Sequence, residues 1–204
     1  MMDSCRVCRK IARAAMCAFV LALPGCAAGP SAMHDRLMYH RAMIDFTGLD
    51  APRVVPDVKV SWSPPTGWVR IVTRRALLFT HDHWRSPSKH TGVGVAYVRM
   101  PLPLPASAIA FVARQEYSRH SDDGRILEQW TDDLGRVFFE GENRTFHVRG
   151  YVVTHGLDAW IVYSGYRMRD GPDPAELSLA LRSAQSIVPL PGGSPAPASV
   201  VAAK

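Results

Sequence analysis

Three histidines near the middle of the chain are the sharpest candidates for chemistry. His81 and His83 stand two residues apart, so both rings project to one side of an extended strand, and His90 follows shortly after. Imidazole nitrogens are good ligands for zinc and related metals. One hypothesis is therefore a periplasmic metal-dependent or hydrolytic enzyme that uses His81, His83 and His90. The alternative, which we favour, is a polar loop over residues 81–91, because no His or Glu stands nearby at a spacing typical of helical metal sites.

A second group contains the residue types of a hydrolase triad, in the order His120, Ser121, Asp122, Asp123. Such triads are assembled by the fold from residues that lie far apart in sequence. The sequence also lacks the Gly-x-Ser-x-Gly turn that presents a nucleophilic serine in α/β-hydrolases. We therefore expect residues 121–123 to form a turn and a helix cap.

The other residues that could do chemistry are the four cysteines, and their positions in the chain decide which roles they can have. Residues 1–13 carry four basic residues and one acidic residue, and an apolar run of ten residues follows at 14–23. Ten residues cannot cross a bilayer, which requires about twenty. Positive charge followed by a short apolar run predicts an export signal that is removed. Cys5, Cys8 and Cys17 would be lost with it, so the mature chain keeps Cys26 alone and forms no internal disulfide.

The residues Leu23-Pro24-Gly25-Cys26 resemble the lipobox of bacterial lipoproteins, although Pro24 departs from the usual small residue. The resemblance implies that residues 1–25 are the signal peptide and that Cys26 becomes the lipidated, palmitate-bearing first residue of the mature protein. Ordinary signal cleavage near Ala28 is the alternative. Ala27 stands where an Asp favours inner-membrane retention, so the resemblance implies an outer-membrane lipoprotein facing the periplasm. Two or three acyl chains hold such a protein stably on the bilayer.

Charge and motifs exclude several other functions. The chain carries a net charge of +6, of which the signal contributes half, and it has no basic run with interleaved aromatic residues. We therefore expect no binding to nucleic acid. The sequence also lacks a phosphate-binding Walker loop and a dinucleotide-binding glycine turn, so no cofactor is expected.

The mature chain divides into three parts by composition. Residues 26–66 are expected to be a lipidated tether with a short helix at 31–46 and a proline-rich linker at 50–65 that holds at most one edge strand. Residues 67–190 are expected to form one globular domain. Residues 191–204, rich in Pro, Gly, Ala and Ser, are expected to be a disordered tail.

The periodicity of the 67–190 segment predicts an α+β domain. Alternating residues predict strands, a spacing of three to four residues predicts helices, and Asp173-Pro174-Ala175-Glu176 is typical of a helix N-terminus. The strands are expected at 68–73, 76–80, 92–100, 136–140, 145–154 and 159–168, and the helices at 106–117, 122–135 and 173–188. Hairpins predict an antiparallel β-sheet with one face packed on helices and the other in water. Among the tryptophans, Trp84 is expected in a loop, and Trp68, Trp130 and Trp160 in the core.

The end of this domain resembles the Mog1/PsbP-like fold. The resemblance rests on the strand pair Phe146-His-Val-Arg-Gly-Tyr-Val-Val and Asp158-Ala-Trp-Ile-Val-Tyr-Ser-Gly-Tyr, followed by a helix that closes in Leu181-Arg-Ser-Ala-Gln-Ser-Ile-Val. It implies a non-catalytic domain with a binding or assembly role. We therefore expect a non-enzymatic, lipid-anchored envelope protein that binds a protein or another envelope component.

Overall fold

The computed structural model describes residues 41–72, 79–120, 123–132 and 135–190, and it contains two antiparallel sheets and two helices. The larger sheet has seven strands in the order β3-β4-β5-β9-β8-β7-β6. Its strands are β3 (Val69–Val72), β4 (Thr80–Arg85), β5 (Thr91–Arg99), β6 (Arg125–Thr131), β7 (Val137–Glu142), β8 (Phe146–His155) and β9 (Asp158–Arg167). The predicted class, an antiparallel sheet packed on helices, is confirmed.

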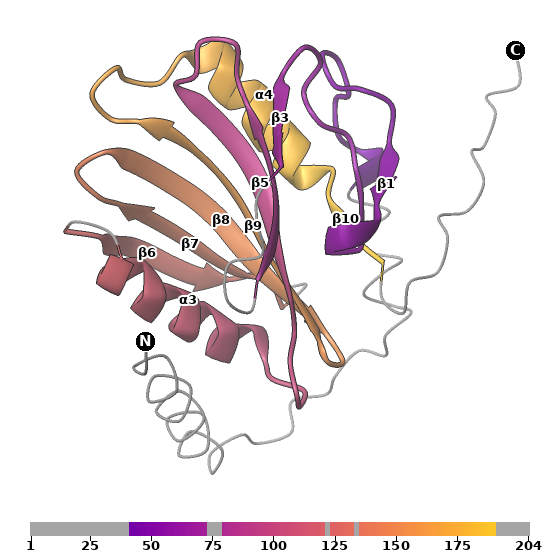
Figure 1. Ribbon diagram of the computed structural model, residues 1–204, viewed down its shortest axis with the longest axis vertical. Helices are drawn as coiled ribbons and strands as arrows, with labels where there is room; N and C mark the ends of the chain where they lie inside the picture. The colour runs from indigo at the N-terminus through magenta and orange to yellow at the C-terminus, as the bar shows by residue number, and fades with distance from the viewer. Residues whose placement is uncertain (1–40, 73–78, 121–122, 133–134, 191–204) are drawn as a thin grey trace, which may run out of the picture.

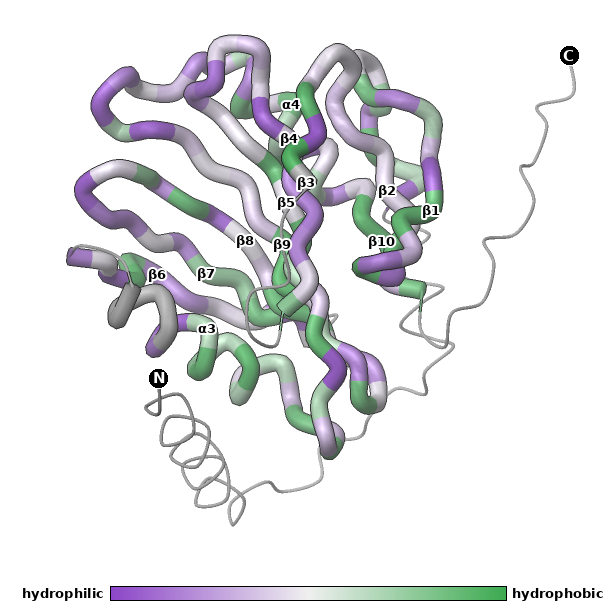
Figure 2. The backbone as a smooth tube through the Cα atoms, viewed as in Figure 1, coloured by the Kyte–Doolittle hydropathy of each residue, from purple (hydrophilic) through white to green (hydrophobic). Residues whose placement is uncertain are grey.

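The two helices lie on opposite faces of the seven-stranded sheet (Figure 1). Helix α4 (Pro174–Gln185) packs on β5 and β9, whereas α3 (Ala106–His120) packs on β8, β7 and β6. The prediction of one wet face is therefore wrong, because each face is covered over part of its width. The turn between β7 and β8 and the loop after β9 are hydrophilic, whereas the strands are hydrophobic where they meet α3 (Figure 2).

The larger core lies between the sheet and α4. Alternate residues of β5, β8 and β9 point toward this helix, in agreement with the strand period of two. The core includes Val93, Val95, Tyr97, Tyr151, Val153, Trp160 and Val162 from the sheet, with Ala180, Ala184 and Ile187 from α4 and the residues after it. The other residues of the same strands build a second core against α3, formed by Val98, Val152 and Ala159 with Ala106, Ile109 and Ala110.

The proline-rich segment before residue 67 belongs to the fold, so the linker prediction is corrected. It forms β1 (Arg53–Val55), the 3-10 turn η1 (Pro56–Val58) and β2 (Val60–Trp62). Strand β2 pairs with β1 on one side and with β10 (Val188–Pro189) on the other, which makes a small three-stranded sheet. The side chains of Val58, Val60 and Trp62 are fully buried in the larger core. The prolines do not interrupt this arrangement, because Pro56 starts the 3-10 turn and Pro64 and Pro65 follow β2.

Two predicted elements have the wrong type. Residues 81–85, expected in a loop, belong to β4, where buried Asp82 and Trp84 alternate with half-buried His81 and His83. Residues 125–131, expected in the helix at 122–135, form β6 at the edge of the sheet. A register shift between Ile126 and Glu128 disturbs the strand period, which explains why the apolar residues of β6 have helical spacing.

The last helix begins as predicted and ends earlier. The Asp173 carboxylate accepts hydrogen bonds from the backbone N–H groups of Ala175 and Glu176, and Pro174 occupies the first turn. The helix ends at Gln185, and Val188 lies in β10 instead of on the helix. The sheet-facing side consists of Ala180, Ser183 and Ala184, so the predicted stripe of Leu177, Leu181, Ala184 and Val188 is correct in part.

Several N-terminal and C-terminal predictions concern residues outside the described part. These are the signal peptide, Cys26, most of the helix at 31–46 and the tail at 191–204; Arg41 and Ala42 are helical. Within the described ranges, no helix is long and apolar enough to cross a membrane.

Candidate functional site

The three histidines of the enzyme hypothesis do not come together. His81 and His83 project from the same side of β4, as the spacing predicts, and they lie on the face opposite α4. His90 lies in the loop between β4 and β5, where its Nδ1 atom is 2.6 Å from a carboxylate oxygen of Asp170. Across residues 41–72, 79–120, 123–132 and 135–190, no group of three or more His, Cys, Asp or Glu is placed to hold a metal ion.

The His83 side chain packs on the face of the sheet opposite α4. Its ring stacks on Tyr163 of β9 at 6.0 Å between ring centroids. A Cβ atom at Gly92 would lie 2.7 Å from the His83 ring, and one at Gly94 would lie 2.6 Å from the Tyr163 hydroxyl, so both glycines make room for rings that lie flat. Burial, with a smaller effect of Arg85, lowers the pKa of His83 to about 4, so this imidazole is neutral at physiological pH.

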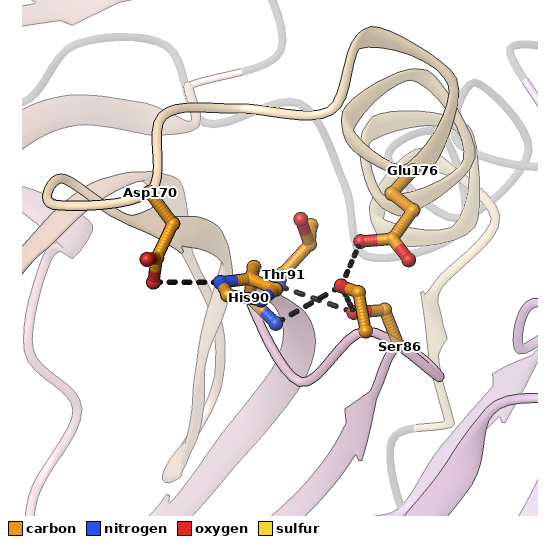
Figure 3. Close-up of polar contacts among 6 residues, drawn as sticks. Ser86, His90, Thr91, Asp170 and Glu176 are labelled. Carbon is orange, nitrogen blue, oxygen red and sulfur yellow. Dashed lines mark hydrogen bonds and ion pairs between the residues drawn. The ribbon is translucent and has the colours of Figure 1, made fainter.

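The loop around His90 forms a polar network with the start of α4 (Figure 3). Ser88 Oγ donates a hydrogen bond to Glu176 at 2.7 Å and lies 3.0 Å from Ser86 Oγ. The backbone N–H of His90 donates to Ser88, and that of Thr91 donates to Ser86. Because the Ser88 hydroxyl is directed at Glu176 and not at the imidazole of His90, the network fixes two loops and does not form a hydrolase triad.

The second triad candidate falls mostly on residues that the structure does not describe. Ser121 and Asp122 lie outside the described residues, and so does the side chain of His120. Asp123 has a left-handed backbone with φ of 55° and its carboxylate accepts a hydrogen bond from Arg144 Nε at 2.6 Å. The residue therefore shapes a turn, as predicted, although a strand and not a helix follows.

The part of the sheet beside α4 presents an ordered set of side chains, which we call the open face; all of them except the buried Tyr151 are at least partly exposed. Strands β6, β7 and β8 contribute to it, and their registers align the side chains in three rows. The rows are Trp130-Phe138-Tyr151, Glu128-Glu140-Arg149 and Arg125-Glu142-His147. Because α4 packs on β5 and β9, much of the outer two strands on this face remains in contact with solvent.

The first row is aromatic and is covered by a cation. Trp130 and Phe138 stack almost parallel, with 5.2 Å between their centroids and 10° between their planes. The Arg136 guanidinium lies 5.1 Å from the rings of both Phe138 and Tyr151. Trp130 is 38% exposed, so its predicted place in the core is wrong. Trp84, predicted in a loop, is instead buried on β4 and packs edge-to-face on Trp62.

The other two rows are charged and largely paired. Glu140 lies 2.7 Å from Arg149 and 2.9 Å from His147, and Arg125 pairs with Glu142. The hydrogen bonds from Arg149, with a smaller contribution from His147, hold the pKa of Glu140 below its ordinary value. The open face therefore carries fixed charges of both signs next to an aromatic row.

A cavity of about 290 Å³ lies beside the aromatic row. It is lined by Met43, Ile44, Asp45, Arg136, Arg182 and Gln185, which come from the N-terminal segment, the start of β7 and α4. Arg182 Nη1 donates to Asp45 Oδ2 at 2.7 Å, and Arg136 pairs with Asp132 at the same distance. Hydrogen bonds from Thr47 and the nearby Arg182 hold the pKa of Asp45 below its ordinary value.

The open face and the cavity beside it could not be predicted from the sequence, because their residues form no recognisable sequence pattern. Arg136 and Arg182 are common surface residues, and the contact between Arg182 and Asp45 joins residues 137 positions apart. The exposed tryptophan was the one available signal, but it required a correct assignment of β6. Stacked rings, an arginine and fixed charges can bind a protein surface, because interface centres are enriched in Trp, Tyr and Arg.

The solved structures with a similar fold include the following two. Cyanobacterial PsbP (CyanoP) from Synechocystis sp. PCC 6803 aligns with 82% of this chain and 97% of its own, with 13% identical residues and a TM-score of 0.49. A protein from Bacteroides thetaiotaomicron VPI-5482 aligns with 71% of this chain and 50% of its own, with 10% identity and a TM-score of 0.41. No protein-family model and no curated protein matches the sequence. Similarity at this level carries no conclusion about function.

Proposed function

We propose that this chain is a lipid-anchored envelope protein whose α+β domain binds a protein partner through the open face. The observation that carries the proposal is Trp130, a tryptophan that is 38% exposed and stacked on Phe138. Burying a large aromatic side chain that is already held in place costs little conformational entropy and contributes strongly to binding. The surrounding charge pairs favour a partner with complementary charges and exclude others.

The sequence supports a position close to the membrane. Arg41, where the described structure begins, is only 15 positions after Cys26 in the chain. Fully extended, such a segment spans at most about 50 Å. A lipid on Cys26 would therefore hold the start of the described domain, at Arg41, within this distance of the bilayer, and the partner would be either another membrane-bound protein or an envelope component.

Binding does not require a catalytic group, so we propose a non-enzymatic role. The hypothesis of an enzyme around His81, His83 and His90 depends on convergent rings, and His90 instead pairs with Asp170. The neutral His83 is stacked on Tyr163 as part of the sheet surface. In our proposal, His83 stabilises the sheet and His90 stabilises the loop between β4 and β5.

Site-specific crosslinking in intact cells tests the binding face. A photoreactive amino acid replaces Trp130 in one variant and Val69 in a matched control, because Val69 is 63% exposed on β3 at the opposite edge of the sheet. We expect one discrete crosslinked protein from position 130 and none from position 69. Equal products from both positions, or none from position 130, would refute the proposed face.

Inhibition of the lipoprotein signal peptidase tests the anchor separately. Globomycin blocks cleavage before a lipidated cysteine, so the precursor that retains residues 1–25 should accumulate in treated cells. The Cys26→Ala variant, which cannot accept lipid, should give no change on treatment. Unchanged processing of the unmodified protein would exclude a lipid on Cys26.

A further inference from the structure

We infer that the face of the sheet opposite α4 binds a sugar phosphate, with the sugar ring on His83 and Tyr163 and the phosphate on Arg85 and Arg167. Helix α3 packs on this face over β8, β7 and β6, and the four side chains lie on β4 and β9 (Figure 1). The open face is on the other side of the sheet, so the inference goes beyond the proposed function and does not depend on it. Each of the four residues is partly exposed, and none of their side chains has a polar partner in the described part of the chain.

The strand register brings these side chains together. Strand β5 lies between β4, which carries His83 and Arg85, and β9, which carries Tyr163 and Arg167. His83 and Tyr163 both pair with Gly94, from opposite sides. The two arginines lie further along the same strands, at the end where the chain turns from β4 into β5. Because β4 and β9 are two strand spacings apart, about 10 Å, two arginine side chains can reach one phosphate above β5.

The two rings form a flat floor on which a sugar can pack. Their planes differ by 24°, and both rings lie across β5, where Gly92 and Gly94 leave room beneath them. Burial lowers the pKa of His83 and raises the pKa of Tyr163, so both rings are neutral at physiological pH. A pyranose presents flat C–H faces, which pack on neutral aromatic rings, and hydroxyl groups along its edge.

The polar atoms of the two rings favour a ligand that forms hydrogen bonds. Neither the Tyr163 hydroxyl nor the His83 ring nitrogens bond to another described residue, and none of these atoms is fully buried. Polar groups that have lost part of their hydration and have no protein partner are stabilised by a ligand that replaces the missing hydrogen bonds. Sugar hydroxyl groups can do so, whereas a purely apolar ligand cannot.

The arginines provide the charge that binds the phosphate. Within the described ranges, Arg85 and Arg167 form no ion pair, in contrast to Arg149 on the open face, which pairs with Glu140. The Nε atom of Arg167 is buried, but its two Nη atoms and the Arg85 guanidinium are not. Strands β3, β4, β5, β8 and β9 place no aspartate or glutamate on this face, so no carboxylate competes for the guanidinium groups. Guanidinium groups bind phosphate through charge-assisted hydrogen bonds.

NMR of the mature protein with three probes provides the test. Glucose 1-phosphate contains the ring and the anion, glucose contains the ring alone, and inorganic phosphate is the anion alone. We expect glucose 1-phosphate to shift the signals of the Tyr163 ring and the Arg85 Nε–H group in a saturable manner, at a lower Kd than either of the other probes. An equal Kd for inorganic phosphate, an equal Kd for glucose, or no response of these signals would overturn the inference.

Single variants separate the two halves of the site. Arg85→Gln and Arg167→Gln should each weaken binding of glucose 1-phosphate about 10-fold or more and leave glucose binding unchanged. Tyr163→Phe keeps the ring and removes the hydroxyl, so it should weaken binding of both sugars. Arg99→Gln is the matched control, because Arg99 is exposed at the far end of β5, on the other face, and also has no ion pair in the described residues. An equal loss of affinity in Arg99→Gln would show an effect of net charge alone and would refute the site.

A competition experiment distinguishes the two sources of a sugar phosphate in the envelope. Phosphatidylcholine vesicles are added with and without monophosphoryl lipid A, whose headgroup is a phosphorylated sugar. Displacement of glucose 1-phosphate only by the vesicles with lipid A would identify a lipid headgroup as the ligand, and no displacement would identify a soluble sugar phosphate. Displacement by phosphatidylcholine alone would contradict recognition of a sugar.

Discussion

The pKa of His83 leads to a quantitative prediction about stability. Burial lowers this pKa from 6.5 to about 4 in the folded protein, so between these values the unfolded chain binds a proton that the folded protein does not. Stability is therefore complete above pH 6.5 and falls as the pH decreases toward 4. At about 1.4 kcal/mol for each pH unit, the loss approaches about 3 kcal/mol.

The variant His83→Phe isolates this contribution, because phenylalanine keeps a flat ring next to Tyr163 and does not titrate. Urea unfolding, followed by tryptophan fluorescence, gives the free energy of unfolding of both proteins from pH 8 to pH 5. Their difference at pH 8 measures the change in packing. Between pH 6.5 and 5, we expect the unmodified protein to lose about 2 kcal/mol more than the variant. Parallel profiles would show that His83 is not desolvated and would refute this reasoning.

Three further predictions concern single contacts. Asp173→Ala removes the carboxylate that caps α4 and should lower the free energy of unfolding by about 1 kcal/mol, measured by urea titration. Gly150→Ala places a Cβ atom 2.3 Å from the Val162 carbonyl oxygen and should destabilise the protein by roughly 1–3 kcal/mol in the same assay, whereas an unchanged stability would mean that the strands separate easily. Glu140→Gln should flatten the decrease in stability below pH 4.5, because the lowered pKa of Glu140 stabilises the fold above this pH and the effect is lost as the pH falls through the folded-state value. Identical acid profiles of the two proteins would contradict that expectation.

Local signals made the second half of the sheet and the last helix predictable. The hairpins of β7, β8 and β9 combine alternating residues with short turns, of which the second contains Gly156, and the start of α4 carries a capping aspartate. In these segments, local preference and tertiary packing favour the same structure. The class of the fold could therefore be predicted before any tertiary contact was known.

The errors arose where long-range pairing decides the structure. Strand β6 has apolar residues at helical spacing, and it is a strand because it pairs with β7 through a register shift. Strand β4 is rich in polar residues, but its pairing with β5 buries Asp82, which Arg70 of β3 then neutralises. The exposure of Trp130 depends on the position of β6 at the sheet edge, which no local pattern specifies.

The cavity could not be predicted for the same reason. Its lining joins residues 43–45 to Arg136 and to α4, segments that are distant in sequence. Burial of η1 and β2 in the larger core brings the N-terminal part of the chain to α4. The prolines around these elements suggested a linker, because proline content alone does not distinguish a linker from short strands joined by turns.

The claim on which the account depends is that Cys26 carries lipid and that the domain acts at the membrane. Intact mass spectrometry of the mature protein, purified from cell membranes, tests it directly. We expect a chain that begins at Cys26, with an added mass equal to a diacylglyceryl group and, where the cell adds it, one further acyl chain. A chain that begins beyond Cys26, near Ala28, and carries no added mass would contradict the account.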